Sequence, residues 1–344
     1  MREKRVGIAM SGGVDSTACA LLLKDHYEIE GFFMQLAQPN FAQQRTKVEA
    51  IAETIGIKLN VIDLRREFEQ KVLHYFSSSY FKGLTPNPCV VCNREIKFGL
   101  FMESILDHGM DKIATGHYAR IIEGDALFRL HCGADPKKDQ SYFLSRLNQR
   151  QLSRILFPLG EKEKKSTYLL VEQHGFSDFR GLESQDVCFL EDKSISHFLE
   201  TCSHQTESSG PIFSSSGEHL GTHHGLFHYT IGQRRGLGIS SDAPLYVIAL
   251  NRENNSVIVG RNEELFRTKI QLRDMHWLTG SPPDPAKDYS VRIRYSHAGA
   301  AATLTLNEGG RGQLLFKEPQ RAITPGQFAV IYDNTELLGS GIIV

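Results

Sequence analysis

Apolar residues recur along the first half of this chain in short runs, each followed by a segment with apolar residues at helical spacing. The run Arg5–Ala9 leads into a helix-forming segment at 17–24, the run 29–36 into a helix at Phe41–Ile55, and a third run covers 59–64. Such repeated strand–helix units predict a parallel sheet with helices on both faces. Ligands of these sheets bind at the carboxyl ends of the strands.

The same alternation continues to about residue 131. Apolar residues four positions apart predict a helix through Phe68 and Tyr80, and a further helix is expected at 93–108. A fourth strand, 112–115, then ends at Gly116, and 120–131 has the pattern of a hairpin. We expect a further helix to begin within residues 160–166, with the side chains of its first turn exposed to solvent.

The pattern changes near residue 204, where turn-forming residues become frequent and helical periodicity fades. A hairpin is expected from 246–250 to 256–259. Alternating apolar and polar residues then fill five short runs, at 291–295, 303–306, 313–316, 328–332 and 337–343. They predict a small antiparallel barrel. The chain is thus α/β, with an expected catalytic domain at 1–204, a central linker domain at 205–271 and a C-terminal β-barrel at 272–344.

Composition narrows the class of protein. The 344 residues are 40% hydrophobic and 23% charged, as in globular proteins with a sizeable core. No apolar run approaches the roughly 18 residues that span a membrane, and the first strand follows the N-terminus at once, so we expect a cytoplasmic protein without a membrane segment. The net charge of −1 leaves nucleic-acid binding to local basic patches. Six cysteines in such a chain favour metal or catalytic roles over a disulfide framework.

A glycine-rich loop, residues 10–16, joins the first strand to the first helix. Its glycines allow backbone N–H groups to approach a ligand closely, and the helix N-terminus favours an anion. Ser11, Ser16 and Thr17 add hydroxyl groups. Neither a Walker A motif nor G-x-G-x-x-G is present. The loop resembles the PP-loop of ATP pyrophosphatases, which cleave ATP between the α and β phosphates; the alternative is an ordinary glycine-rich turn.

The pair Cys89 and Cys92 allows three interpretations: structural zinc, a redox dithiol or a sulfur-handling site. Zinc normally requires a second pair of ligands, which the sequence lacks. Cys188 supports the sulfur-handling interpretation. Cys92 is expected near a helix N-terminus, which would lower its pKa, whereas Cys19 lies in an apolar helix and is expected in the core.

Taken in order, several motifs resemble those of the tRNA-specific 2-thiouridylase (MnmA) family over nearly the whole chain. They lie at 11–16, 87–98, 114–119, 138–143, 184–189, 229–238 and 324–327. The resemblance implies a HUP-like PP-loop domain that uses ATP and Mg²⁺ to adenylate the C2 oxygen of the wobble uridine in tRNAs for Lys, Glu and Gln. A persulfide sulfur then displaces AMP. The resemblance further implies that a sulfur-relay protein or cysteine desulfurase supplies that sulfur to Cys188, and that Cys92 is the partner nucleophile that forms a disulfide with it.

The resemblance also assigns binding residues. Those implied for ATP are Ala9, Met10, Ser11, Gly12, Gly13, Val14, Asp15, Ser16, Met34 and Gly116. Those implied for the target base and the tRNA are Asn87, Pro88, Cys89, His117, Lys138, Asp139, Gln140, Arg294, Tyr295 and Gln327. Independently, the alternating basic and aromatic run at 291–295 suits backbone contact and base stacking, although a solvated strand face has the same pattern.

Two departures from the family pattern affect the mechanism. The segment after Met34 lacks a longer acidic insertion often found there. Cys89 stands where some members have Asp, so Cys89, Cys92 and Cys188 could hold three corners of a [4Fe–4S] cluster, and persulfide and cluster mechanisms both remain open. A different PP-loop ligase would need no Cys188, and an RNA-binding module with a vestigial nucleotide site would not need the intact loop.

Overall fold

The N-terminal part of the protein is a parallel sheet. A computed structural model describes residues 4–38, 40–176, 187–190, 194–202 and 208–344. Five strands pair in the order β3-β2-β1-β4-β7, and all four pairings are parallel. Their bounds are β1 Arg5–Ala9, β2 Glu28–Gln35, β3 Leu59–Asp63, β4 Lys112–Ala114 and β7 Ile155–Leu156. The predicted parallel sheet is confirmed.

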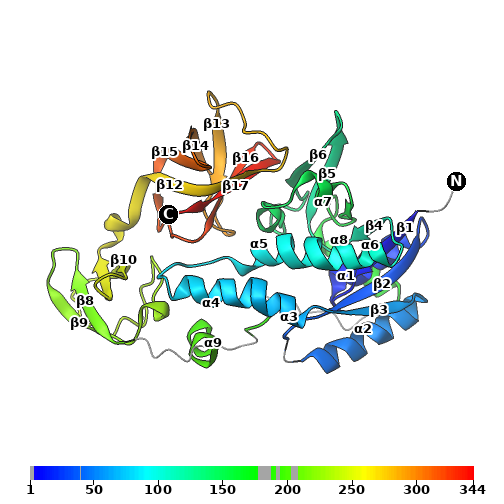
Figure 1. Ribbon diagram of the computed structural model, residues 1–344, viewed down its shortest axis with the longest axis horizontal. Coiled ribbons are helices and arrows are strands. Elements are labelled where there is room, and N and C mark those ends of the chain that lie inside the picture. The colour runs from blue at the N-terminus through cyan, green and yellow to red at the C-terminus, as the bar shows by residue number, and fades with distance from the viewer. Residues whose placement is uncertain (1–3, 39, 177–186, 191–193, 203–207) are drawn as a thin grey trace.

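Helices cover both faces of this sheet, as the sequence pattern predicts. One face packs against α1 (Val14–Leu23), α2 (Phe41–Ile55) and α8 (Lys164–Gln173) through buried residues such as Val6, Val48 and Val171. The other face is covered by two long helical stretches that run side by side in Figure 1. The first is α3 (Arg65–Phe68), η1 (Glu69–Leu73) and α4 (His74–Tyr80), and the second is α5 (Pro88–Cys92), η2 (Asn93–Phe101) and α6 (Met102–Asp107). Both η segments are π-helical.

The strand order reverses between β1 and β4, because β2 and β3 extend to one side of β1 whereas β4 and β7 extend to the other. In open parallel sheets the crevice at such a reversal, beyond the carboxyl ends of the strands, is where ligands bind. The glycine-rich loop follows β1, and Gly116 and His117 follow β4. Two of the predicted functional segments therefore meet at this crevice.

The central part is a small mixed sheet. After α9 (Ile195–Cys202), four strands pair in the order β10-β11-β8-β9. They are β8 Gly210–Ser214, β9 His219–His223, β10 Tyr246–Asn251 and β11 Ser256–Gly260. The β10–β11 hairpin was predicted, whereas the parallel pairing of β8 with β11 was not.

The C-terminal part is a closed antiparallel barrel of six strands. The order is β12-β15-β14-β13-β16-β17, and β12 pairs with β17 to close it. The strands are β12 Phe266–Trp277, β13 Asp288–Arg292, β14 Ala300–Asn307, β15 Arg311–Arg321, β16 Phe328–Asp333 and β17 Glu336–Ile343. The hairpin β5 (Ala119–Gly124) and β6 (Leu127–Cys132) extends this sheet through β17. The predicted strand at 291–295 is wrong in its second half, because β13 ends at Arg292 and the next residues form a bend.

One hydrophobic core joins the N-terminal part to the barrel. Phe98 and Ile105 of the second helical stretch belong to the same cluster as Phe328 and Tyr332 of β16. The two parts are therefore packed on each other, with the long helices beneath the barrel in Figure 1. Within the described parts of the chain, no helix has the length and apolar character needed to cross a membrane.

Candidate active site

The loop after β1 closes around the first turn of α1. Gly12 has φ +76°, a left-handed conformation that favours glycine. Ser16 Oγ donates to the Gly13 carbonyl (3.0 Å) and accepts from the Ser11 backbone N–H (3.2 Å). The unpaired N–H groups at this helix end and the helix dipole favour a bound anion. The geometry therefore fits the phosphate site expected from the sequence.

Two side chains from other elements hold the carboxylate of Asp15. Lys164 Nζ lies 2.8 Å from both carboxylate oxygens, and Tyr118 Oη donates to Oδ1 (3.0 Å). Lys164 is the first residue of α8 and is buried. The expectation of a solvated helix start at 160–166 is therefore wrong for this residue. A helix does begin there, but its first side chain points inward to the glycine-rich loop.

Gly116 allows the end of β4 to approach this loop closely. A Cβ atom at Gly116 would lie 2.7 Å from Asp15 Cβ and 3.2 Å from the Ser16 backbone nitrogen. Both distances are too short for a side chain to be accommodated without movement of the loop. The absence of a side chain at Gly116 is therefore required for the loop and the end of β4 to meet.

A cavity of about 580 Å³ lies next to His117. Aromatic side chains of the first helical stretch, including Phe68 and Phe76, form part of its wall. It brings together residues that the sequence assigns to sulfur chemistry or to the tRNA, namely Asn87, Pro88, Cys89, Cys92, His117, Gln140, Cys188 and Tyr295. Folding thus places Cys92 and Cys188, 96 positions apart in the chain (188 − 92), on one cavity.

The thiols of this cavity are kept protonated. Helix α5 starts at Pro88 with Asn87 as its N-cap, so Cys89 lies in the first turn and Cys92 is the last residue. Burial raises the pKa of Cys92 to about 12 and that of Cys89 to about 11, and in both cases the Lys97 ammonium opposes the rise. The expectation that a helix N-terminus lowers the pKa of Cys92 is therefore wrong. Cys188 is exposed, but surrounding protein atoms still raise its pKa by desolvation.

His117 is a neutral group in this structure. Its Nδ1 lies 2.7 Å from Thr115 Oγ1, and its ring centroid lies 5.6 Å from that of Phe98. Burial, with a smaller effect of Lys97, holds the pKa of His117 well below its usual range. His117 can therefore stack or form hydrogen bonds at neutral pH, but it does not supply a positive charge.

The residues assigned to the tRNA have different environments. Tyr295 is 40% exposed, and its ring centroid lies 4.4 Å from the ring centroid of Phe143. Lys138 and Arg294 are half-buried. Gln140 Oε1 accepts from the Tyr118 backbone N–H (3.1 Å), which fixes the Gln140 side chain at the cavity.

Two further residues of that set face the protein interior. The Asp139 carboxylate is buried and accepts from Arg292 Nη1 (2.6 Å) and from the Ser141 backbone N–H (3.1 Å). Gln327 Nε2 donates to the carbonyls of Thr85 (2.9 Å) and Pro86 (3.3 Å), immediately before Asn87. Both side chains therefore hold neighbouring segments in place in this structure.

The three thiols do not form a metal-binding cluster. Within the described segments, which contain Cys89, Cys92 and Cys188, no group of three His, Cys, Asp or Glu side chains has an arrangement that could hold a metal ion. A [4Fe–4S] cluster bound at three corners requires three thiolates converging on one centre. This arrangement of residues does not fit such a cluster.

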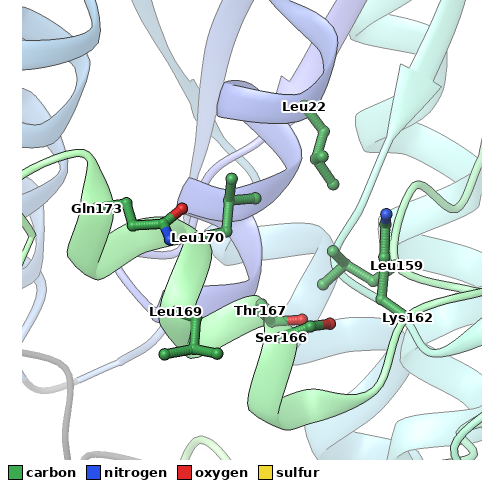
Figure 2. A pocket seen from close by; sticks show the side chains of 8 residues that line it. All are labelled: Leu22, Leu159, Lys162, Ser166, Thr167, Leu169, Leu170 and Gln173. Carbon is green, nitrogen blue, oxygen red and sulfur yellow. The ribbon is translucent and has the colours of Figure 1, made fainter.

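A second, smaller cavity of about 220 Å³ lies between α1 and α8. Figure 2 shows that leucine side chains of both helices, including Leu22 and Leu170, line it. No thiol or carboxylate is found among its described lining residues. The cavity therefore offers no group suited to sulfur transfer.

Comparison with known proteins defines the family. The model of the tRNA methyl transferase HUP domain matches residues 4–192, that of the tRNA methyl transferase PRC-barrel domain matches 196–261, and that of the aminomethyltransferase beta-barrel domain matches 267–343. The tRNA-specific 2-thiouridylase MnmA of Desulfotalea psychrophila is 56% identical over 344 residues, which are 100% of both chains. The chain belongs to the tRNA-specific 2-thiouridylase MnmA family. Relatives of the same name from Syntrophotalea carbinolica (42% identity, 99% of both chains) and Magnetococcus marinus (41% identity, 100% of this chain and 99% of the other) agree.

Three side chains of this family member were not assigned from its sequence. Lys164 holds Asp15, and Lys97 lines the thiol cavity. Gln151 Nε2 donates to the carbonyls of Arg94 and Phe98 (2.9 Å each), on the π-helical segment η2. The Asn148 and Gln151 spacing is a capping-box signal for α7 (Gln149–Leu152), but that signal does not indicate a partner in another helix.

Proposed function

We propose that this protein is a tRNA 2-thiouridylase that uses ATP to replace the C2 oxygen of wobble uridine 34 with sulfur in tRNAs for Lys, Glu and Gln. One observation carries the proposal. Gly116 packs against the glycine-rich loop at Asp15, and the next residue, His117, lines the thiol cavity. Because consecutive Cα atoms lie about 3.8 Å apart, a base held between the two sites would be within reach of both.

The first step is adenylation. The triphosphate binds the loop Ala9–Ser16 at the N-terminus of α1, with Lys164 as the nearby cation, while Met34 at the end of β2 lies beside the nucleotide. The C2 oxygen attacks the α-phosphorus, a P–O bond forms, and the bond to the β-phosphate oxygen breaks to release pyrophosphate. Asp15 is the residue that would hold Mg²⁺, which would supply neutralisation of the charge on the leaving group.

The second step is sulfur transfer. The terminal sulfur of a Cys188 persulfide attacks C2, a C–S bond forms, and the C2–O bond breaks to release AMP. The Cys92 thiolate then attacks Cys188 Sγ; the S–S bond breaks, sulfur stays on the base, and a Cys92–Cys188 disulfide forms. A dithiol reductant restores both thiols, and a sulfur-relay protein or cysteine desulfurase delivers the next persulfide sulfur. The shared cavity supports these roles for the two cysteines.

The tRNA would lie across the catalytic domain and the barrel. Tyr295 is exposed beside Phe143 and suits base stacking, while Lys138 and Arg294 suit phosphate contacts. Asn87, Pro88, Cys89 and Gln140 line the cavity that would receive the flipped base. Asp139 and Gln327 would contribute indirectly, since their side chains hold the neighbouring segments.

Two alternative chemistries are less well supported. A cluster mechanism needs converging thiolates, which this arrangement lacks. Methyl transfer, the activity in the family models' descriptions, would require neither a PP-loop nor paired cysteines. The anion-binding loop and the thiol cavity both favour thiolation.

Reconstitution tests the proposed function. Full-length protein is incubated with ATP, a tRNA(Lys) transcript, cysteine and a cysteine desulfurase, and the nucleosides are analysed by mass spectrometry. We expect 2-thiouridine, AMP and pyrophosphate. Cys92→Ser and Cys188→Ser should form no 2-thiouridine but still release pyrophosphate, whereas Cys132→Ser, at a half-buried thiol outside the cavity, should behave like wild type. A methylated base, or no modified base with the wild-type protein, would contradict the proposal.

A further inference from the structure

The thiol cavity contains one charged side chain among its described lining residues, Lys97. Lys97 is half-buried, and among the described residues its ammonium group has no hydrogen bond or ion pair. The other lining groups are aromatic, aliphatic, thiol, hydroxyl or amide groups and the neutral imidazole of His117. A cation withdrawn from water without a partner costs free energy. Its position therefore suits an anion that is present only during the reaction.

The backbone is built so that Lys97 shares a face with Cys92. Cys92 ends α5, and Lys97 follows five positions later on the π-helical segment η2. Residues five positions apart in an α-helix lie about 140° apart around the axis, since each residue turns about 100°. The i→i+5 repeat of a π-helix brings such residues onto one face instead, and π-helical turns are frequent at functional sites.

The π-helical segment η2 is held in place by a side chain of another helix, α7. The Gln151 side-chain amide donates to the carbonyls of Arg94 and Phe98, two residues that flank Lys97 along η2. Within the same segment Gly99 has φ −97° and ψ −107°, which is not helical. The orientation of Lys97 is thus maintained by a dedicated contact, and Gln151 is a positioning residue.

We propose that Lys97 is a further catalytic residue, whose ammonium group stabilises anionic sulfur in the cavity, first on the persulfide of Cys188 and then on the thiolate of Cys92. This role rests on the proposed function and specifies how the thiols are activated. The anion is sulfur and not phosphate, because the three thiols line the cavity of Lys97 whereas the glycine-rich loop has its own cation, Lys164.

The electrostatic effects agree with this geometry. Lys97 lowers the pKa of Cys89, Cys92 and Cys188, in opposition to burial. Among the described lining residues, the titratable groups of the cavity are Lys97, the three thiols, neutral His117 and the tyrosines Tyr80 and Tyr295. Removal of the ammonium should therefore raise the pKa of these thiols and decrease their thiolate fractions.

Thiol reactivity provides a test that does not depend on thiolation. Full-length wild type, Lys97→Met, Lys97→Arg and the control Lys71→Met are alkylated with iodoacetamide between pH 6.5 and 9.5, and Cys92 and Cys188 peptides are quantified by mass spectrometry. Lys71 is an exposed residue paired with Glu95. At a fixed pH below the pKa, the thiolate fraction falls about tenfold for each unit by which the pKa rises. We therefore expect Lys97→Met to slow alkylation at pH 8 by roughly 3- to 10-fold. Lys97→Arg should restore most of the rate, and Lys71→Met should leave it unchanged.

Two further measurements separate an effect of Lys97 on the thiols from an effect on folding or on adenylation. Thermal unfolding of Lys97→Met should occur at the wild-type temperature or higher, because an unpaired half-buried charge has been removed. Pyrophosphate release with tRNA, which reports adenylation, should persist while sulfur transfer falls with thiol reactivity. Wild-type alkylation profiles for Lys97→Met, or loss of pyrophosphate release with unchanged thiol reactivity, would overturn the proposal. Failure of the wild-type protein to thiolate tRNA would contradict the proposed function. The alkylation profiles would still test whether Lys97 controls the reactivity of the thiols.

Discussion

The Arg292 guanidinium lies 2.6 Å from the buried carboxylate of Asp139, and this ion pair joins the C-terminal barrel to the N-terminal part of the protein. Arg292 ends β13, and its guanidinium also lies 4.8 Å from the ring centroid of Tyr332. Asp139 precedes Gln140, which lines the thiol cavity. The barrel therefore holds the segment that carries Lys138 and Gln140.

Loss of this ion pair should destabilise the protein. Asp139→Ala leaves a partly buried guanidinium without its carboxylate, and removal of one partner of a buried pair typically costs about 3–5 kcal/mol. We expect a clear fall in the thermal unfolding midpoint, measured by circular dichroism. The matched control is Lys317→Met, which breaks the more exposed pair with Asp288 on the barrel and should cost no more than about 1 kcal/mol. Equal unfolding midpoints for the two variants would show that the Asp139–Arg292 ion pair does not stabilise the fold.

The sequence pattern predicts regular elements better than it predicts this contact. Helix Phe41–Ile55 has the predicted bounds because its apolar stripe, through Val48 and Ile51, is a local property of the chain. In the run 291–295, alternation suggests a continuous strand whose basic and aromatic residues suit RNA contact, with a solvated face as the alternative. Arg292 instead turns inward to Asp139, 153 positions away in the chain, and β13 ends there. No local pattern contains information about a partner at that distance.

Lys164 should be required for adenylation. Its ammonium group lies 2.8 Å from both oxygens of Asp15 at the loop that would bind ATP. In Lys164→Met the half-exposed Asp15 carboxylate loses its counter-ion and repels phosphate, so we expect tRNA-dependent AMP release to fall at least about tenfold. Asp15→Ala and Ser16→Ala should abolish it. The control is Lys165→Met, a change in the exposed neighbouring residue. ADP and phosphate as the products of wild type would contradict cleavage between the α and β phosphates.

The candidate site was predicted where its residues form contiguous motifs. Cys92 and the loop Ala9–Ser16 could be identified because each lies in a short recognisable pattern. Lys164, Lys97 and Gln151 were missed because their importance comes from side chains that folding brings to them. The pKa of Cys92 was misjudged for a related reason. The helix starts five residues earlier than expected (93 − 88), and burial outweighs any effect of the helix dipole.

Lys138 and Arg294 should contribute phosphate contacts to tRNA binding. Each contact that is lost lowers the number of counterions released, so the slope of log K against log salt should become shallower by roughly 0.7 to 0.9 per contact. We expect the Lys138→Ala, Arg294→Ala double variant to bind tRNA more weakly in filter binding at several salt concentrations, while ATP binding remains unchanged. Lys317→Met, which changes an exposed lysine of β15 that is not assigned to the tRNA, serves as the control. A wild-type affinity and slope for the double variant would exclude this surface as the docking site.

Cys89 distinguishes the persulfide mechanism from a cluster mechanism. In the persulfide mechanism Cys89 lines the base pocket and forms no bond, so Cys89→Asp should keep substantial activity without iron, and Cys89→Ala should also remain active. In a cluster mechanism Cys89→Ala removes a ligand and should abolish activity. The measurement is single-turnover thiolation by anaerobically purified protein, with iron counted and persulfide trapped by alkylation.

The pH dependence of the same assay tests which thiol limits the second step. Burial raises the pKa of Cys92 to about 12, so this thiol is protonated at neutral pH. As long as the pH stays below the pKa, each unit by which the pH is raised increases the thiolate fraction about tenfold. If attack by Cys92 limits turnover, the single-turnover rate should rise steadily from pH 7 to pH 9. Iron-free protein that carries a Cys188 persulfide and transfers it to tRNA with this profile would support the two-thiol mechanism. Activity that requires about four irons per chain, with no trapped persulfide, would exclude it.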